Sequence, residues 1–237
     1  MTSDYTLLDQ PMVLQYLFHP RPDTGTRRQS NGRYDMMIPV EKTVQVGASF
    51  HFADPHAPTV LFFHGNGEIV SDYDDLGRLF VQHQMNLFVV DYRGYGSSSG
   101  SPSVSAMMQD SVKILDFVLA YRQAEKHSGT LCVMGRSLGS ASALELAAQR
   151  PDDFDCLVIE SGFAKAEPLL QTLGAVLPEA AGNLSYGREN IDKIRLFLKP
   201  LLVIHAQYDH IIPFADGQAL FDACPSADKT LLEIKGA

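Results

Sequence analysis

Hydrophobic and polar residues alternate regularly along this chain from residue 59 onward. Short apolar runs are separated by longer stretches in which apolar residues recur every three or four positions. Runs of the first kind are typical of strands in a parallel sheet buried on both faces, and the longer stretches are typical of helices packed on it. The pattern predicts strands at 59–63, 86–90, 130–134, 156–160, 201–205 and 230–234, and helices at 72–83, at 104–126, directly after Ser137 and at 214–223.

Other segments precede this alternation. Residues 1–33 end in a polar, turn-rich stretch, so we expect an N-terminal arm there. Within the arm, the apolar stretch 7–18 is expected to pack on the domain, and a peripheral membrane contact is the alternative. Residues 34–40 and 43–52 predict an antiparallel hairpin. We therefore expect one α/β domain at 34–237, with a mostly parallel sheet, this hairpin at its start and helices on both faces.

The alternation stops between Gly162 and Pro200, where almost forty residues lack a strand-like run. A crossover this long usually carries an inserted element over the active site. We expect a short helical lid at about 163–199, with an ordinary crossover helix and a long loop as the alternative. Its apolar residues would line an acyl pocket; they are Leu169, Leu170, Leu173, Val176, Leu177 and Leu184.

Composition narrows the classes of partner. The chain has 237 residues, 45% hydrophobic and 20% charged, with a net charge of −9. This excess of acidic residues argues against a nucleic-acid partner, because phosphate binding needs a surplus of Lys and Arg on one face. No apolar stretch approaches the length of a membrane-spanning helix, and no secretory signal is recognisable at the N-terminus. The histidines and cysteines show no metal-ligand spacing, and we expect no cofactor.

The three cysteines are odd in number and widely spaced. Cys132 and Cys156 fall in apolar strand-like runs and are expected to be buried free thiols, which suits a reducing compartment. A cytoplasmic location is therefore expected. The sequence leaves the oligomeric state open.

The motif with the clearest chemical meaning is Gly135-Arg136-Ser137-Leu138-Gly139. It reads Gly-x-Ser-x-Gly and stands between a predicted strand and a predicted helix, which is the context of a nucleophile elbow. In such an elbow a serine hydroxyl is lifted above the sheet edge, and the flanking glycines allow the strand and helix to pass closely. A βα turn with a helix-capping serine is the alternative.

A serine nucleophile needs a base, and the base needs a carboxylate to orient it. Asp209 follows the predicted strand 201–205 and is the first candidate for that carboxylate, ahead of Glu160 at the end of strand 156–160. A helix-capping role is the alternative for Asp209. Between Asp209 and the next helix stands Pro213, which weakens that alternative.

Two glycine-rich turns follow earlier strands. In His64-Gly65-Asn66-Gly67 the backbone N–H of Asn66, together with that of Leu138, would stabilise an oxyanion, whereas His64 is expected to hold the loop. Residues 91–98 contain Gly-x-Gly after a strand but lack the third glycine of a dinucleotide site. We expect this second turn to pack beneath the nucleophile loop.

Together these motifs resemble the α/β-hydrolase superfamily, and most closely its small esterases, thioesterases and serine-aminopeptidase-like members. The resemblance covers about residues 34–237. It implies a small-molecule acyl substrate, Ser137 as nucleophile, Asp209 as triad acid, and Asn66 and Leu138 as oxyanion donors. The motifs that carry it are His64–Gly67, Asp91–Ser97, Gly135–Gly139 and His205–Pro213.

One expected part of the triad is missing from the sequence. In related hydrolases the catalytic histidine follows the last strand, but no histidine follows His210 here. We expect the histidine, and the amphipathic helix usual after it, to lie beyond Ala237. The chain as printed should then be nearly inactive, because loss of the base removes most of the turnover. The alternative is a non-catalytic binding protein on a hydrolase scaffold.

Overall fold

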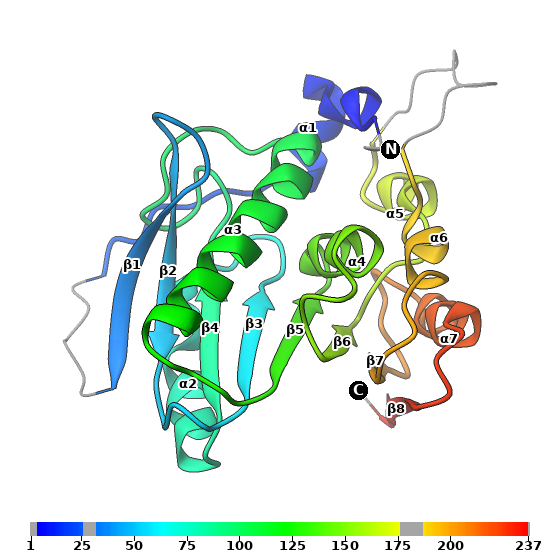
Figure 1. Cartoon of the computed structure of the whole chain (residues 1–237). Helices are drawn as coiled ribbons and strands as arrows, with labels where there is room; N and C mark the ends of the chain where they lie inside the picture. Colours follow the sequence, from blue (N-terminus) through cyan, green and yellow to red (C-terminus); the bar gives the residue numbers. More distant parts are fainter. Residues whose placement is uncertain (1–3, 26–31, 176–186, 237) are drawn as a thin grey trace.

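The computed structural model describes residues 4–25, 32–175 and 187–236. Figure 1 shows one sheet with helices packed around it. The strands are β1 (Arg33–Pro39), β2 (Gln45–His51), β3 (Thr59–Phe63), β4 (Asn86–Val90), β5 (Leu131–Arg136), β6 (Cys156–Glu160), β7 (Leu201–Ala206) and β8 (Lys229–Ile234). The helices are η1 (Thr6–Asp9), α1 (Pro11–Leu17), η2 (Val70–Tyr73), α2 (Asp74–Gln82), α3 (Val104–Ala124), α4 (Gly139–Gln149), α5 (Ala166–Thr172), α6 (Asn190–Ile194) and α7 (Phe214–Ala223).

The strands form a single sheet in the order β1-β2-β4-β3-β5-β6-β7-β8. The hairpin β1–β2 is antiparallel, and β2 also pairs antiparallel with β4. From β4 through β3 to β8 every neighbouring pair is parallel. The predicted α/β architecture, a mostly parallel sheet with an antiparallel start, is therefore confirmed.

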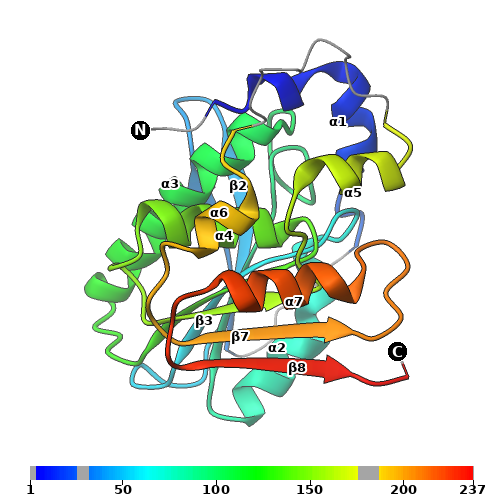
Figure 2. The same ribbon diagram turned by 90° about the vertical axis from the view of Figure 1, so that its right-hand side faces the viewer.

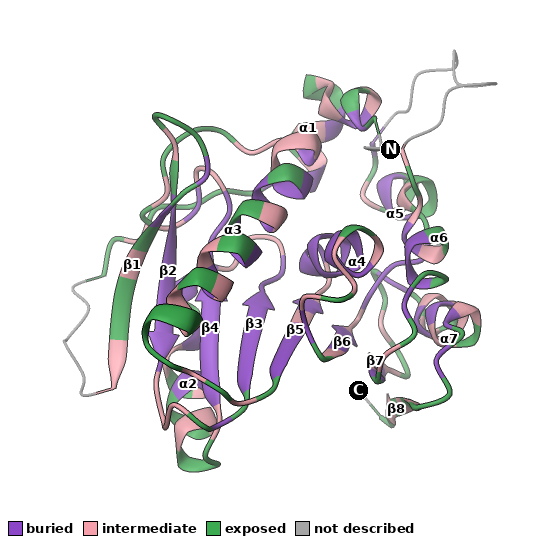
Figure 3. Cartoon of the chain, in the orientation of Figure 1, coloured by how far each residue is buried: buried purple, intermediate pink, exposed green. Residues whose placement is uncertain are grey.

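The centre of the sheet is buried on both faces. All residues of β3 and β4 are buried, and Figure 3 colours both strands purple over their whole length. After a polar first residue, their sequences, Thr-Val-Leu-Phe-Phe and Asn-Leu-Phe-Val-Val, are continuous apolar runs, as strands covered on both sides require.

The two faces of the sheet carry different helices. On one face, the side chains of Leu61, Val133 and Val203 belong to the main core with residues of α3, α4, α6 and α7. On the other face, Phe62 and Val89 pack with Val70 and Tyr73 of η2 and with residues of α2. Figure 2 shows α7 lying along β7 and β8. Helices on both faces are thus confirmed.

The N-terminal segment packs into the main core. Leu8 of η1 and Val13 and Leu17 of α1 are buried with the residues of α3 and α4. The stretch 7–18 therefore packs on the domain, as expected from its apolar character. Within the described ranges, none of the helices combines the length and apolar character needed to cross a bilayer.

The long segment after β6 contains α5 and α6. Leu169 and Leu170 on α5 are buried. Leu173 is only partly buried, and the remaining predicted pocket residues Val176, Leu177 and Leu184 lie outside the described residues, so the predicted lid stays a prediction as a whole.

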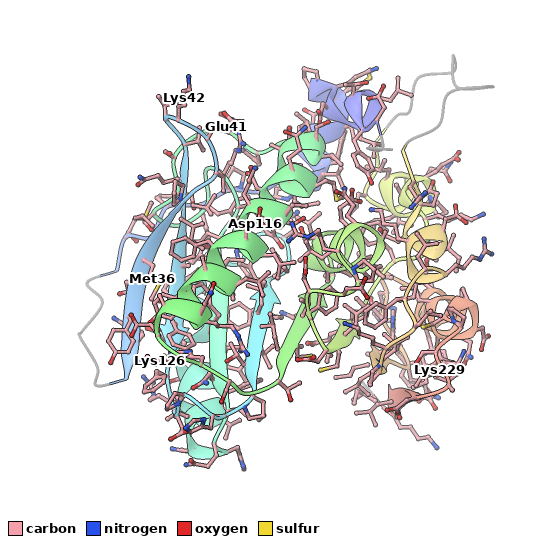
Figure 4. The ribbon with its side chains drawn as sticks, viewed as in Figure 1. Met36, Glu41, Lys42, Asp116, Lys126 and Lys229 are labelled. Carbon is pink, nitrogen blue, oxygen red and sulfur yellow. The ribbon has the colours of Figure 1, made fainter. Side chains whose placement is uncertain are left out.

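Charged side chains lie at both margins of the sheet. Glu41 and Lys42, labelled in Figure 4, stand at the tip of the β1–β2 hairpin and are exposed. At the opposite end of the sheet, the Lys229 ammonium donates to the carbonyl oxygens of Phe221 (2.8 Å) and Cys224 (2.7 Å) at the end of α7. A cation is favoured there, because the last carbonyls of a helix carry partial negative charge.

The prediction that Cys156 is buried is wrong. All three cysteines are free, and Cys132 is buried, but Cys156 is only partly buried. The two are direct partners on β5 and β6 and point to the face that carries α2. Helix α2 packs on β4 and β2, so this face of the sheet is less covered by helix at β6.

Candidate active site

Ser137 occupies a sharp turn between β5 and α4. Its backbone φ is +50°, in the left-handed region that residues other than glycine rarely adopt. Both flanking glycines are sterically required. A Cβ on Gly135 would overlap the backbone of Gly139, and one on Gly139 would overlap the carbonyl of Phe63 on β3. The turn therefore has the geometry of a nucleophile elbow.

Hydrogen bonds hold this turn at the start of the helix. The Ser137 N–H donates to the Glu160 carbonyl (2.9 Å), and the Ser140 hydroxyl donates to the Ser137 carbonyl (2.6 Å). The Ser137 hydroxyl and the Leu138 N–H make no hydrogen bond with any described residue. The first N–H groups of α4 carry partial positive charge, which favours an anion beside Ser137.

The loop after β3 is held by its own side chains. The Asn66 Oδ1 accepts from the Tyr95 hydroxyl (2.6 Å) and from the His19 N–H (2.9 Å). These bonds fix the Asn66 side chain, while its backbone N–H donates to no described residue. His64 is fully buried, with its ring nitrogens at the Gly65 carbonyl (2.8 Å) and the Asp91 carboxylate (3.2 Å).

The turn after β4 does not lie where we expected it. Instead of packing beneath the nucleophile loop, it packs against the loop after β3. The Tyr92 hydroxyl donates to the His64 carbonyl (2.6 Å), and Asp91 accepts from the Val70 N–H (2.9 Å). The reason is the sheet order: β4 neighbours β3 on the side away from β5.

Asp209 lies in the turn after β7. Its Oδ1 accepts from the N–H groups of Ile211 and Ile212, both at 2.9 Å. Its Oδ2 lies 3.8 Å from Nε2 of His205, whose ring is buried and bonded to the Ile212 carbonyl (2.8 Å). The side chain of Asp209 is 18% exposed. Oδ2 accepts no hydrogen bond from any described residue, so it can accept one from another group.

The strand register relates the candidate residues to one another. Arg136, Glu160 and Ile204 are direct neighbours across β5, β6 and β7. Ser137 directly follows this row on β5, and Asp209 follows it in the turn after β7. Both therefore lie at the carboxyl edge of the sheet, where ligands bind in open α/β sheets.

A network of charged side chains joins the loop after β3 to the turn at Ser137. The sequence did not suggest this network. The Glu68 carboxylate accepts from the Gly65 N–H (2.6 Å) and from the Arg136 guanidinium. Arg136 also pairs with Glu160 at 3.2 Å. Burial raises the pKa of Glu160, and Arg136 opposes this. Glu160, the reserve candidate for the triad acid, thus serves as the partner of Arg136.

Most of the described histidines contact groups other than Ser137. Among the residues that the structure describes, no histidine ring is hydrogen-bonded to Ser137. His56 contacts Ser128, and His127 packs against Phe52 and Phe50. Nor do these parts of the chain hold a group of three or more side chains arranged to bind a metal ion.

A largely apolar cavity adjoins the elbow. Leu138 contributes to its wall together with Phe163, Leu169 and Leu170, and the volume open to the centre of a water molecule is about 40 Å³. Lys193 and Asn190 of α6 also line it. The predicted pocket residues Leu169 and Leu170 therefore face a cavity next to the candidate nucleophile.

Comparisons with known proteins agree with this geometry. Residues 54–195 match the family "Serine aminopeptidase, S33". Protein bem46 of Schizosaccharomyces pombe is 30% identical over 177 residues, which are 73% of this chain and 58% of that protein. The human alpha/beta hydrolase domain-containing protein 17B is 29% identical over 194 residues, 79% of this chain and 63% of that protein. The chain spans 55–63% of the length of the curated relatives it matches.

Solved structures share the fold. The monoacylglycerol lipase of Paleococcus ferrophilus superposes with a TM-score of 0.60 at 20% identity, over 81% of this chain and 89% of that one. A soluble variant of the monoglyceride lipase of Saccharomyces cerevisiae superposes with a TM-score of 0.68 at 16% identity, over 88% and 87%. These likenesses confirm the predicted α/β-hydrolase fold.

Proposed function

Because the chain belongs to the serine aminopeptidase S33 family of α/β hydrolases, we propose that it is a serine hydrolase which cleaves a carboxylic ester, thioester or amide. Ser137 is the nucleophile. One observation carries the proposal: Ser137 has a φ of +50° between two glycines whose Cβ atoms would not fit. A serine that only capped a helix would adopt ordinary extended dihedrals and would not need both glycines.

The reaction proceeds through an acyl-enzyme. The Ser137 oxygen attacks the substrate carbonyl carbon while a base removes its proton, and the carbonyl oxygen becomes an oxyanion. The N–H groups of Asn66 and Leu138 donate to that oxyanion. Collapse expels the leaving group with a proton from the same base, and water then releases the acyl group by the reverse steps. Loss of one such donor typically lowers the turnover about 10²–10³-fold.

The base in this proposal is a histidine oriented by Asp209. The Oδ2 atom of Asp209 accepts the histidine N–H, because Oδ1 is already occupied by Ile211 and Ile212. We assign the histidine to the segment that follows β8 in the natural protein. Its support is the register: β8 pairs with β7 up to Ala206 and Ile234, so both strands end at the edge that carries Asp209.

The acyl group in this proposal is apolar. Leu138, Phe163 and Leu169 line the cavity beside the elbow, and burial of methylene groups there stabilises the complex by about 0.8 kcal/mol each. An alkyl or aryl acyl chain fits such a lining better than a charged peptide side chain does. The leaving group would remain toward the solvent side of Ser137.

A fluorophosphonate probe on the complete natural protein tests the assignment. We expect covalent labelling that Ser137→Ala abolishes. The matched control is Ser161→Ala, because Ser161 also ends a parallel strand with a positive φ, +46°, and should leave labelling unchanged. Labelling that survives Ser137→Ala would refute the nucleophile. If the complete protein is neither labelled nor able to hydrolyse p-nitrophenyl esters, it is a binding protein on this scaffold.

A further inference from the structure

The cavity beside the elbow follows helix α4 away from the nucleophile. Leu138 lines it next to Ser137, and Ala141, one turn further along, lines it as well. Tyr5 and Lys193 also line the cavity, and both contact Glu145, one further turn along the same helix. The cavity therefore extends from the elbow toward a buried polar cluster formed by Tyr5, Glu145 and Lys193.

The N-terminal segment closes one side of this cavity. Tyr5, Leu8 of η1 and Leu17 of α1 line it opposite the residues of α3 and α4. Helix α1 contacts α5, which supplies Leu169 and Leu170. In Figures 1 and 2 the N-terminal helices, in blue, lie over one end of α3, and Figure 2 shows α1 beside α5. The segment thus forms a wall of the cavity as well as part of the core.

Tyr5 is fixed by contacts on several sides. Its hydroxyl donates to Glu145 Oε2 (2.6 Å), and the Lys193 ammonium lies 5.2 Å from the centre of its ring. A Cβ on Gly187 would overlap the ring, so the ring packs directly on that backbone. Lys193 and Glu145 are 3.0 Å apart, with side chains 1% and 3% exposed. A buried ion pair needs such complete hydrogen bonding to be tolerated, and here it holds Tyr5 in one place.

The position of Tyr5 sets a length along the cavity. Leu138 precedes Glu145 by seven residues of helical backbone, which corresponds to about 10 Å at 1.5 Å per residue. An extended chain advances by about 1.2 Å per bond, a third of the reach of one residue. An acyl chain of about eight carbons that starts at Ser137 would therefore reach the Tyr5 ring.

We propose that the N-terminal segment 5–18 is a specificity-determining wall of the acyl pocket, in which Tyr5 and Leu8 limit the acyl chain to about eight carbons. The inference rests on the proposed acyl-transfer function of Ser137. Tyr5 ends the pocket because a longer chain would have to displace the ring from Glu145 and Lys193. Leu8 narrows it from the side, since its buried side chain faces the same cavity.

Binding of saturated fatty acids tests the wall without requiring catalysis. Butanoate, octanoate and dodecanoate are titrated into the protein by calorimetry, and we expect octanoate to bind most tightly. Tyr5→Ala, which removes the ring at the end of the pocket, should raise the dodecanoate-to-octanoate affinity ratio at least about tenfold, and Leu8→Trp, which narrows the pocket further, should lower the octanoate-to-butanoate ratio by a similar factor. Met12→Ala is the matched control, because Met12 lies on α1, is 43% exposed and does not line the cavity. Its ratios should not change.

Two outcomes overturn the wall: no binding of any chain length by the unchanged protein, or affinity ratios that stay the same in both folded wall variants, Tyr5→Ala and Leu8→Trp. Hydrolysis of p-nitrophenyl esters by the complete natural protein is measured in parallel. Ratios that shift in a protein without hydrolytic activity would support the wall and count against the acyl-transfer function. Hydrolysis with unchanged affinity ratios would support the acyl-transfer function and overturn the wall. Melting followed by circular dichroism confirms that each variant is folded.

Discussion

Gly139 shows how a single residue sets the geometry of the elbow. A Cβ at this position would overlap the carbonyl of Phe63 on β3, so Gly139→Ala must push the start of α4 away from the sheet. We expect the free energy of unfolding to fall by about 1–3 kcal/mol, as for other overpacked sites. The rate of fluorophosphonate labelling at Ser137 should fall as well, because the N–H of Leu138 moves with the helix. Urea unfolding and labelling kinetics measure the two effects.

The matched control for Gly139 is Gly25→Ala. A Cβ on Gly25 would meet only the end of the flexible Asp23 side chain, at 3.3 Å. Its free energy of unfolding should change by no more than about 0.5 kcal/mol. Equal effects of the two substitutions would show that the close approach to β3 does not constrain the elbow.

Local motifs identify single residues only where the chemistry is local. The strained turn at Ser137 was predictable because the glycines that it requires stand two positions away on either side. The role of Ser137 as nucleophile remains a prediction. The contact of Glu68 with Arg136 was not predictable, since 68 positions separate them and the sheet order alone brings them together. The acid role of Asp209 and the oxyanion roles of Asn66 and Leu138 remain predictions at this scale.

At the scale of elements, periodicity was a good guide to strands and a poor guide to neighbours. Strands β3, β4 and β6 have the predicted bounds, because a short apolar run flanked by polar residues defines both ends of a buried strand. The place of the turn after β4 was predicted wrongly. The order of the strands in the sheet depends on how the crossovers pack. Local periodicity does not predict that order.

Helix α6 has only five residues, so a tertiary contact must hold it. One such contact is the buried pair between Lys193 and Glu145 of α4. Lys193→Met leaves the Glu145 carboxylate buried without its counter-charge and should lower the free energy of unfolding by about 3–5 kcal/mol. The double variant Lys193→Met/Glu145→Leu removes both charges and should recover most of this loss. Urea unfolding at neutral pH measures both.

A surface pair on the same helix provides the control. Arg195 and Asp192 are paired at 2.6 Å, with side chains 59% and 48% exposed, so Arg195→Met should cost less than about 1 kcal/mol. The pH dependence is a second readout of the buried pair. Burial raises the pKa of Glu145, but Lys193, the Tyr5 hydroxyl and Gln149 together hold it below its ordinary value of 4.5.

The sign of the pH effect follows from that lowered pKa. The stability from the pair is present above pH 4.5 and is lost as the pH falls through the lower pKa of folded Glu145. Protonation there leaves the Lys193 ammonium buried alone. Between about pH 5 and pH 3 the unchanged protein should therefore lose more unfolding free energy than the double variant. Parallel pH curves for the two proteins would contradict a stabilising pair.

For the whole molecule, the N-terminal segment and the crossover between β6 and β7 meet over the carboxyl edge of the sheet. Tyr5, α4 and α6 are joined at one buried cluster, although they come from three distant parts of the chain. The sequence indicated that the stretch 7–18 would pack on the domain but not where. That position depends on Glu145, a residue which its charge alone would place at the surface.

The last strand leaves an apolar strip at the margin of the molecule. In the part of the chain that the structure describes, β8 is an edge strand, and Leu232 and Ile234 on one face of it are 45% and 40% exposed. Exposed apolar side chains on an unpaired edge favour association with another chain. We therefore expect residues 1–237 to self-associate with rising concentration, and Leu232→Lys/Ile234→Lys to suppress this. Size-exclusion chromatography with light scattering measures the mass of each.

The two introduced lysines should suppress self-association by placing charge on the edge strand, without changing the stability of the fold. Leu232 and Ile234 are both exposed, at 45% and 40%, so the double substitution should change the free energy of unfolding by no more than about 0.5 kcal/mol. Leu198→Lys is the matched control, because Leu198 is 72% exposed but lies in the loop before β7, off the sheet edge. It should leave self-association unchanged. Equal suppression by both variants would mean that net charge, and not the edge of β8, governs association.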